Sequence, residues 1–212
     1  MPTTDTRARI LDAAERIFTD AGLEGFSLRA VTAAAGVNVA AVNYHFGSKA
    51  ALLRALVRQV FATVHVEQAR LLDALEAATP QPEAAAVLNA YATPIFALFD
   101  TAHAREWGRV WIAAREADDP SRERAPMQFA DTALTRRYGE ALRLALPDLP
   151  SDELWWRFER ANNLLMANRG MRAMAAGGED GENAPSAERR WLLTFLVGAL
   201  KAPASGAQRA AE

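Results

Sequence analysis

The sequence has no cysteine, only three histidines and no hydrophobic run long enough to cross a membrane. Without cysteine the chain forms no disulfide and performs no thiolate chemistry, which fits the reducing cytoplasm. The longest apolar stretch, residues 191–200, contains one threonine and is shorter than the roughly 20 residues of a membrane helix. The N-terminus lacks the basic start and apolar core of a signal peptide. We therefore expect a cytoplasmic protein without a membrane segment.

Sequence motifs for catalysis are missing as well. Neither a glycine-rich phosphate loop nor a Gly-x-Ser-x-Gly elbow occurs in the sequence. His103 and Glu106 stand three residues apart, the reverse of the Glu-x-x-His order in carboxylate-bridged metal sites. No second copy of the pair exists, so a surface pair is the simpler interpretation. We expect no enzyme activity, no metal and no cofactor.

Acidic residues are unevenly distributed along the chain. The net charge is −2, but residues 1–60 hold seven Arg or Lys against five Asp or Glu, which gives +2. The remainder holds seventeen against twenty-one, which gives −4. Between Gly25 and Val66 there is no Asp or Glu at all. A basic segment in a mildly acidic chain is typical of a surface that binds nucleic acid.

Capping residues within this basic segment predict two short helices. Ser27 begins the first helix, and Gly36 ends it in a sharp turn. Asn38 caps the second helix, Gly47 ends it, and Ser48 caps a longer third one. Two short helices joined by a glycine-containing turn form a helix-turn-helix, whose second helix enters the major groove of DNA. Any tight helical hairpin is the alternative interpretation.

The second short helix carries polar side chains that can reach a base edge or a phosphate. They are Asn38, Asn43, Tyr44 and His45. A solvated structural hairpin more often carries charges of both signs. Together with the acid-free segment, these side chains indicate DNA binding.

Helical periodicity continues to residue 200, and no segment shows the alternation of a β-strand. The fold class is therefore all-α, with a small helix-turn-helix head joined by a long helix to a second helical domain. The other predicted helices span residues 5–21, 48–78, 83–100, 104–117, 122–146, 151–176 and 186–200. The predicted domains are a DNA-binding domain at 1–48, a ligand-binding and dimerisation domain at 49–200 and a disordered tail at 201–212.

A family resemblance rests on the first fifty-five residues. Ala35-Gly36-Val37, a short helix and then Tyr-His-Phe-Gly-Ser-Lys-x-x-Leu from Tyr44 resemble the signature of the tetracycline-repressor (TetR) family. Residues 9–18 and 22–29 are similar to the family's preceding patterns, whereas Ala50 departs from its usual glutamate. The resemblance implies a homodimeric repressor, a palindromic double-stranded DNA operator and a small-molecule inducer. It adds DNA-contact positions at Ser27, Arg29, Val39, Ala41 and Lys49.

Aromatic residues are concentrated in the predicted second domain. Four of the five tryptophans lie between residues 107 and 156, and ligand pockets are mostly apolar with a few polar groups. The candidate lining residues are Phe96, Phe99, His103, Trp107, Arg109, Trp111, Trp155, Phe158, Asn162 and Asn163. These aromatics also suit an ordinary helical core. Residues 141–158 resemble family members that respond to long-chain fatty acids, which implies an apolar or amphipathic ligand.

The last predicted helix is apolar nearly all round, and a helix without a polar face is buried on both sides. A second copy of the chain would cover it, although a wholly internal helix is the alternative. The candidate interface residues, here and at small residues of the preceding helix, are Ala161, Gly170, Trp191, Phe195 and Leu196. We expect a DNA-binding regulator released by its ligand. The alternative is a helical ligand-binding or protein-interaction module without sequence-specific DNA binding.

Overall fold

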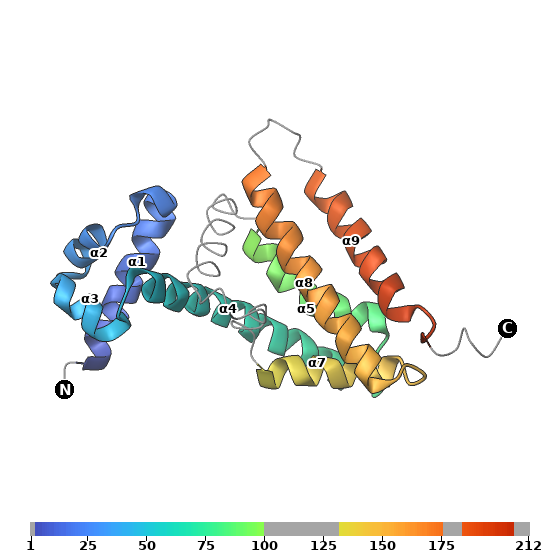
Figure 1. Cartoon of the computed structure of the whole chain (residues 1–212). Coiled ribbons are helices and arrows are strands. Elements are labelled where there is room, and N and C mark those ends of the chain that lie inside the picture. Colours follow the sequence, from blue (N-terminus) through green and yellow to red (C-terminus); the bar gives the residue numbers. More distant parts are fainter. Residues whose placement is uncertain (1–2, 100–131, 176–183, 206–212) are drawn as a thin grey trace. The chain divides into compact units, whose positions relative to one another are not determined.

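The computed structural model describes residues 3–99, 132–175 and 184–205. These residues form eight helices and no strand, which confirms the all-α prediction (Figure 1). The helices are α1 (Thr3–Gly25), α2 (Leu28–Ala35), α3 (Val39–Phe46), α4 (Lys49–Ala78), α5 (Ala84–Phe99), α7 (Thr132–Ala145), α8 (Ser151–Ala175) and α9 (Ala184–Lys201). None of the described helices is long and apolar enough to cross a membrane.

Two compact units divide the described residues. Of the described residues, the first unit contains 3–62, 99 and 170–174, and the second contains 63–98, 132–169, 175 and 184–205. In the first unit α1 packs against α2 and α3. Its core also includes the start of α4, where Leu52 and Leu56 are fully buried. The predicted boundary after residue 48 therefore marks the end of the three-helix head, whereas the compact unit extends further along α4.

The second unit is held together by buried polar contacts as well as by apolar packing. The Tyr91 hydroxyl donates to Oδ1 of Asn162 at 2.9 Å, and the Tyr138 hydroxyl donates to the Gln68 carbonyl at 2.8 Å. Nε2 of Gln68 donates to the Tyr91 carbonyl at 2.7 Å. Burial raises the pKa of both tyrosines well above the usual range, so they remain neutral donors. The network links α4, α5, α7 and α8. Because a buried polar group that loses its partner is costly, these bonds favour one arrangement of the four helices.

Arg157 in α8 caps the C-terminal end of α9. Its side chain is only 10% exposed. The last carbonyls of a helix have no amide donors within the helix, and the two Nη atoms of Arg157 supply donors at this end. Nη1 donates to the carbonyls of Ala202 at 2.6 Å and of Ala199 and Leu200 at 3.1 Å, and Nη2 donates to Pro203 at 2.9 Å. The prediction of disorder from residue 201 onward is therefore wrong for residues 201–205, while residues 206–212 lie outside the described residues.

Most predicted helix boundaries agree with the structure to within two residues, with two differences. The first helix was predicted to end near residue 21. It extends to Gly25, with an interruption at Gly22, whose φ is 63°. The last helix begins at Ala184, so Ser186 lies within it and is not its cap. The predicted helix at 104–117 and the start of the one at 122–146 lie outside the described residues.

Protonation of Glu153 should weaken the attachment of the chain after α9. The Glu153 carboxylate accepts from the Ser205 hydroxyl at 2.8 Å, pairs with Arg157 and accepts from the Ser205 amide. The Ser205 hydroxyl, followed by Arg157, lowers the pKa of Glu153 below its ordinary 4.5. This contribution to stability is present above the ordinary value and is lost as pH falls through the lowered one. Glu153→Gln should reduce the acid dependence of the unfolding midpoint. Glu140→Gln, at an exposed position of α7, is the control and should leave that dependence unchanged. An unchanged acid dependence in Glu153→Gln would contradict this assignment.

Candidate nucleic-acid interface

The local sequence of α2 fixes both of its ends. Oγ of Ser27 accepts from the Ala30 amide at 3.1 Å, as an N-cap does. Gly36 ends the helix with φ of 63°, a left-handed conformation in which a side chain is strained. Its amide donates to the Ala33 carbonyl at 3.3 Å, and the next amide, of Val37, donates to Thr32 at 3.0 Å. This pair of bonds is a Schellman motif, and it turns the chain directly into α3.

Caps define α3 in the same way. Oδ1 of Asn38 accepts from the Ala41 amide at 2.9 Å, and the Gly47 amide donates to the Asn43 carbonyl at 2.9 Å. Val42 is 0% exposed and points into the core of the head. Because one side of α3 is anchored by Val42, the opposite side faces solvent.

The solvent-exposed stripe of α3 is formed by Val39, Ala40, Asn43 and Tyr44. Tyr44 is 79% exposed and Val39 is 45% exposed, and Ala40 and Asn43 are exposed as well. Spacings of three residues (Ala40 to Asn43) and four residues (Val39 to Asn43, Ala40 to Tyr44) place these side chains on one face of the helix. The sequence analysis did not assign Ala40 to the site, although its position one residue after Val39 and three before Asn43 was sufficient to find it.

The remaining predicted contact residues flank this stripe. Ala41 and His45 are half-buried, and the His45 ring lies edge-on to Tyr44 with centroids 5.1 Å apart. Asn38 is exposed at the start of α3, while Ser27 and Arg29 are exposed at the start of α2. The Ser27 oxygen is used in capping, but its hydroxyl proton can still be donated to a phosphate.

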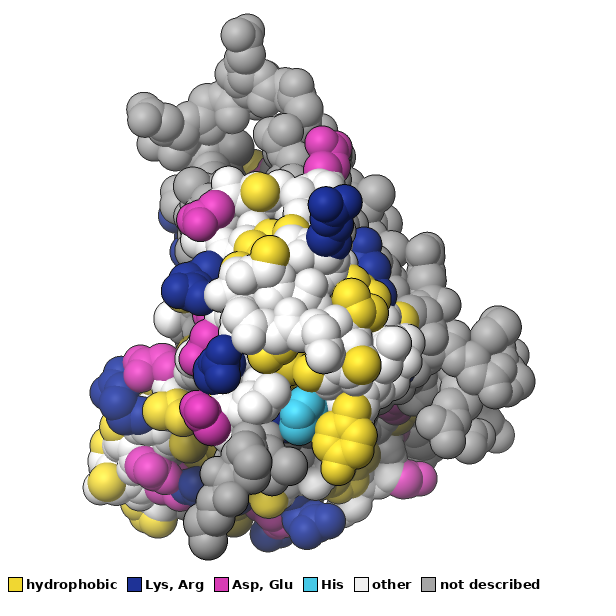
Figure 2. Space-filling model, turned by 90° about the vertical axis from the view of Figure 1, so that its left-hand side faces the viewer, with side chains coloured by type: hydrophobic (Ala, Val, Ile, Leu, Met, Phe, Trp, Pro, Cys, Tyr) yellow, Lys and Arg dark blue, Asp and Glu magenta, His cyan; other side chains and the backbone are white. Residues whose placement is uncertain are grey.

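Basic side chains complete the surface. Lys49 is exposed at the start of α4, and its ammonium lies 5.7 Å from the centre of the Phe26 ring. Figure 2 looks onto the side where α2 and α3 lie, and there a middle part of uncharged side chains is bordered by Arg and Lys side chains in dark blue and by Asp and Glu side chains in magenta. Within the acid-free segment, the exposed Arg29 and Lys49 beside the uncharged stripe of α3 suit DNA, because phosphates flank the base edges of the groove.

Comparison with known proteins places these helices in a family. Residues 10–56 match the model of bacterial regulatory proteins of the tetR family. Residues 89–199, more than half of the chain, match the tetracyclin repressor-like C-terminal domain. The chain belongs to the TetR family. It is therefore a DNA-binding transcriptional regulator, as the resemblance in the sequence predicted.

Other comparisons bear on the fold alone. The chain is similar to a crystal structure of a candidate transcriptional regulator from Streptomyces coelicolor A3(2), at 22% identity and a TM-score of 0.56. The similarity covers 93% of this chain and 98% of the other. A comparison with curated proteins finds no match.

No group of three or more metal-ligating side chains occurs within residues 3–99, 132–175 and 184–205.

The candidate ligand residues of this TetR-family chain fall into three groups. Phe96, Phe158 and Asn162 are buried in the second unit, and Phe158 lies edge-on to Tyr91 with centroids 5.2 Å apart. Trp155 is 37% exposed, and Asn163 is half-buried. His103, Trp107, Arg109 and Trp111, and the side chain of Phe99, lie outside the described residues.

The candidate dimer residues divide by burial. Trp191 and Phe195 are 65% and 62% exposed on α9. Leu196 and Ala161 are already buried within the single subunit, at 1% and 4% exposed. They are core residues of the subunit, which corrects their assignment to an interface. Gly170 lies within α8.

Lys49→Ala should weaken binding to all DNA sequences to a similar extent. The expectation follows from the position of Lys49 beside the solvent-exposed stripe of α3, where its ammonium can contact a phosphate but no base. Removing one phosphate contact reduces the magnitude of the negative slope of log K against log salt concentration by about 0.9. Binding titrations at several salt concentrations measure this slope, with Lys201→Ala at the end of α9 as the control. A slope that does not change in Lys49→Ala would rule out the phosphate contact.

Proposed function

We propose that this TetR-family protein is a homodimeric repressor that binds a palindromic operator and is released by a small apolar or amphipathic ligand. The observation that carries the DNA-reading part is the solvent-exposed stripe of α3. Its side chains are held outward by the buried Val42 and by caps at both helix ends. The helix can therefore enter a major groove without rearranging the head.

Within the stripe, Asn43 is the candidate base reader. A side-chain amide can bond adenine through two hydrogen bonds, which discriminates against a wrong base by about 1–3 kcal/mol. Tyr44 and Val39 add apolar area next to it, which suits the methyl group of thymine. Ser27, Arg29 and Lys49 hold the adjoining phosphates and set the register of α3 on the duplex.

The proposed dimer surface combines stripes on α8 and α9. On α9, Trp191 and Phe195 are exposed, and a Cβ built on Gly198 would meet nothing within 4 Å. On α8, Trp156 and Leu164 are 60% and 45% exposed. Large exposed apolar side chains at helical spacing mark a surface that another protein covers. A second copy covers it through an isologous two-fold contact, which also pairs two α3 helices for a palindrome.

The proposed ligand lies among the aromatic residues of the second unit. The described candidates offer mainly apolar surface, together with the amide of Asn162 next to the Tyr91 hydroxyl. The Arg189 guanidinium also lies 5.6 Å from the centre of the Phe96 ring. Apolar walls with one cation and one amide suit a fatty acyl compound better than a sugar or a nucleotide. Such a ligand releases DNA only by its differential affinity for the two states of the protein.

Selection of genomic DNA fragments by the purified protein tests the DNA-reading proposal. The wild type should enrich one palindromic sequence. Asn43→Ala should lose the preference at one position in each half-site, because it removes the amide that reads the base. Asn89→Ala is the matched control, since that exposed amide lies on α5 and donates to the Ala85 carbonyl. Enrichment of no sequence would favour a helical module without sequence-specific DNA binding.

Phe195→Glu should convert the dimer into monomers. The substitution places a charge in a surface that the partner desolvates, which costs several kcal/mol unless the charge is paired. Sedimentation at micromolar concentration measures the mass. Leu144→Glu is the control, because Leu144 is 43% exposed on α7, away from both stripes. A soluble wild-type monomer under these conditions would contradict the proposed interface.

A further inference from the structure

Two arginines near the start of α1 contact the two ends of the segment that carries α3. Nη2 of Arg9 donates to the Ala35 carbonyl at 2.6 Å, and the Gly36 carbonyl lies 3.5 Å from the same nitrogen. The Arg7 guanidinium lies 5.1 Å from the centre of the Phe46 ring, at the last residue of α3. The turn before α3 and the end of α3 are thus both held from α1.

The turn has an acceptor that its own hydrogen bonds do not satisfy. The Schellman motif uses the carbonyls of Thr32 and Ala33, which leaves the carbonyl of Ala35 at the end of α2. The last carbonyls of a helix carry partial negative charge, so a cation placed there is favourable. Arg9 supplies both that charge and a directed hydrogen bond across 26 residues of sequence.

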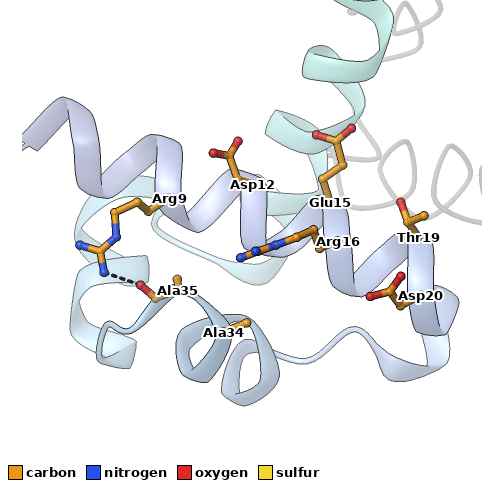
Figure 3. Close-up of a pocket in the computed structure, with 8 residues that line it drawn as sticks. All are labelled: Arg9, Asp12, Glu15, Arg16, Thr19, Asp20, Ala34 and Ala35. Atoms are coloured by element: carbon orange, nitrogen blue, oxygen red, sulfur yellow. Dashed lines mark hydrogen bonds between the residues drawn. The ribbon is translucent and has the colours of Figure 1, made fainter.

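The surroundings of Arg9 direct it toward this turn. Arg9 lines a groove between α1 and α2 together with Asp12, Glu15 and Arg16. In Figure 3 the carboxylates of Asp12 and Glu15 point away from α2, whereas the Arg9 guanidinium reaches the Ala35 carbonyl. A Cβ built on Gly36 would lie 3.2 Å from Nη2 of Arg9. Guanidinium and turn are therefore closely packed.

Such anchors matter because α3 has little else to hold it. It is eight residues long, and Val42 is its single fully buried residue. An isolated helix of this length does not persist in water, so its direction depends on contacts at its ends. The Arg9 contact fixes the end from which the helix starts, and the Arg7 contact holds the ring at the other end.

We propose that Arg9, with Arg7 as a second anchor, is a positioning residue for DNA recognition. It acts through the α2–α3 turn and does not itself read or bind DNA. The inference rests on the proposed function, because it requires α3 to be the reading helix. Loss of Arg9 should allow α3 to vary in direction while the rest of the head stays folded.

The test compares Arg9→Met with the wild type on two DNA duplexes. One is the duplex that the wild type selects, and the other is a scrambled duplex of the same length and composition. Arg9→Met should bind the selected duplex about tenfold more weakly, the equivalent of one charge-assisted hydrogen bond. Its affinity for the scrambled duplex and its salt slope should stay unchanged. The affinity of Arg9→Lys for the selected duplex should lie between those of the wild type and Arg9→Met, because lysine keeps the charge but lacks the planar guanidinium. Arg16→Met removes the same charge from α1 and should match the wild type.

Amide hydrogen exchange without DNA gives an independent measurement. In Arg9→Met, the amides of residues 43–46 in α3 should exchange several-fold faster, while those of residues 52–56 in α4 should be unchanged. Equal losses on both duplexes with a reduced salt slope would instead make Arg9 a phosphate contact and overturn the inference. Unchanged exchange in α3 would overturn it as well. Failure of the wild type to select any duplex would overturn the proposed function, and this inference with it.

Discussion

A helix of eight residues cannot hold its own shape in water, and the helix proposed to read DNA in this protein is of that length. Every feature around α3 compensates for that shortness. Asn38 caps its start, the Gly36 turn fixes its entry, and Val42 anchors one side in the core. The position of the exposed stripe therefore depends on contacts that its neighbours supply.

The second unit depends on polar contacts within its core. Gln68 on α4 is tied to α5 and α7 by bonds through the Tyr91 carbonyl and the Tyr138 hydroxyl. Tyr91 in turn bonds Asn162, one of the proposed ligand residues. A ligand that binds at Asn162 would have to replace that bond or preserve it. A change at Asn162 would then alter the hydrogen bonds of Tyr91 and, through them, those of Gln68 on α4. The start of α4 belongs to the first unit.

Local signals in the sequence were sufficient for the helices and the caps, because Ser27, Gly36 and Asn38 act on neighbours within a few residues. The Arg9 contact was not predictable, since it joins atoms 26 residues apart and no periodic pattern marks it. The apolar pattern of α9 also could not show which of its sides is buried within the subunit and which is exposed. Leu196 and Phe195 are adjacent and equally hydrophobic, yet the first is buried in its own subunit and the second is exposed.

The central claim is that α3 enters the major groove, and directed cleavage tests it most directly. The chain has no cysteine, so Ala40→Cys carries an iron chelate at one defined place on the exposed stripe. If the protein binds as the proposed dimer, it should cut its selected duplex in two patches roughly 10 base pairs apart, the spacing of successive major grooves on one face. The same chelate on Asp12→Cys, on the side of α1 that points away from α2 (Figure 3), should cut little. Equal cutting from both positions, or none from residue 40, would contradict the account.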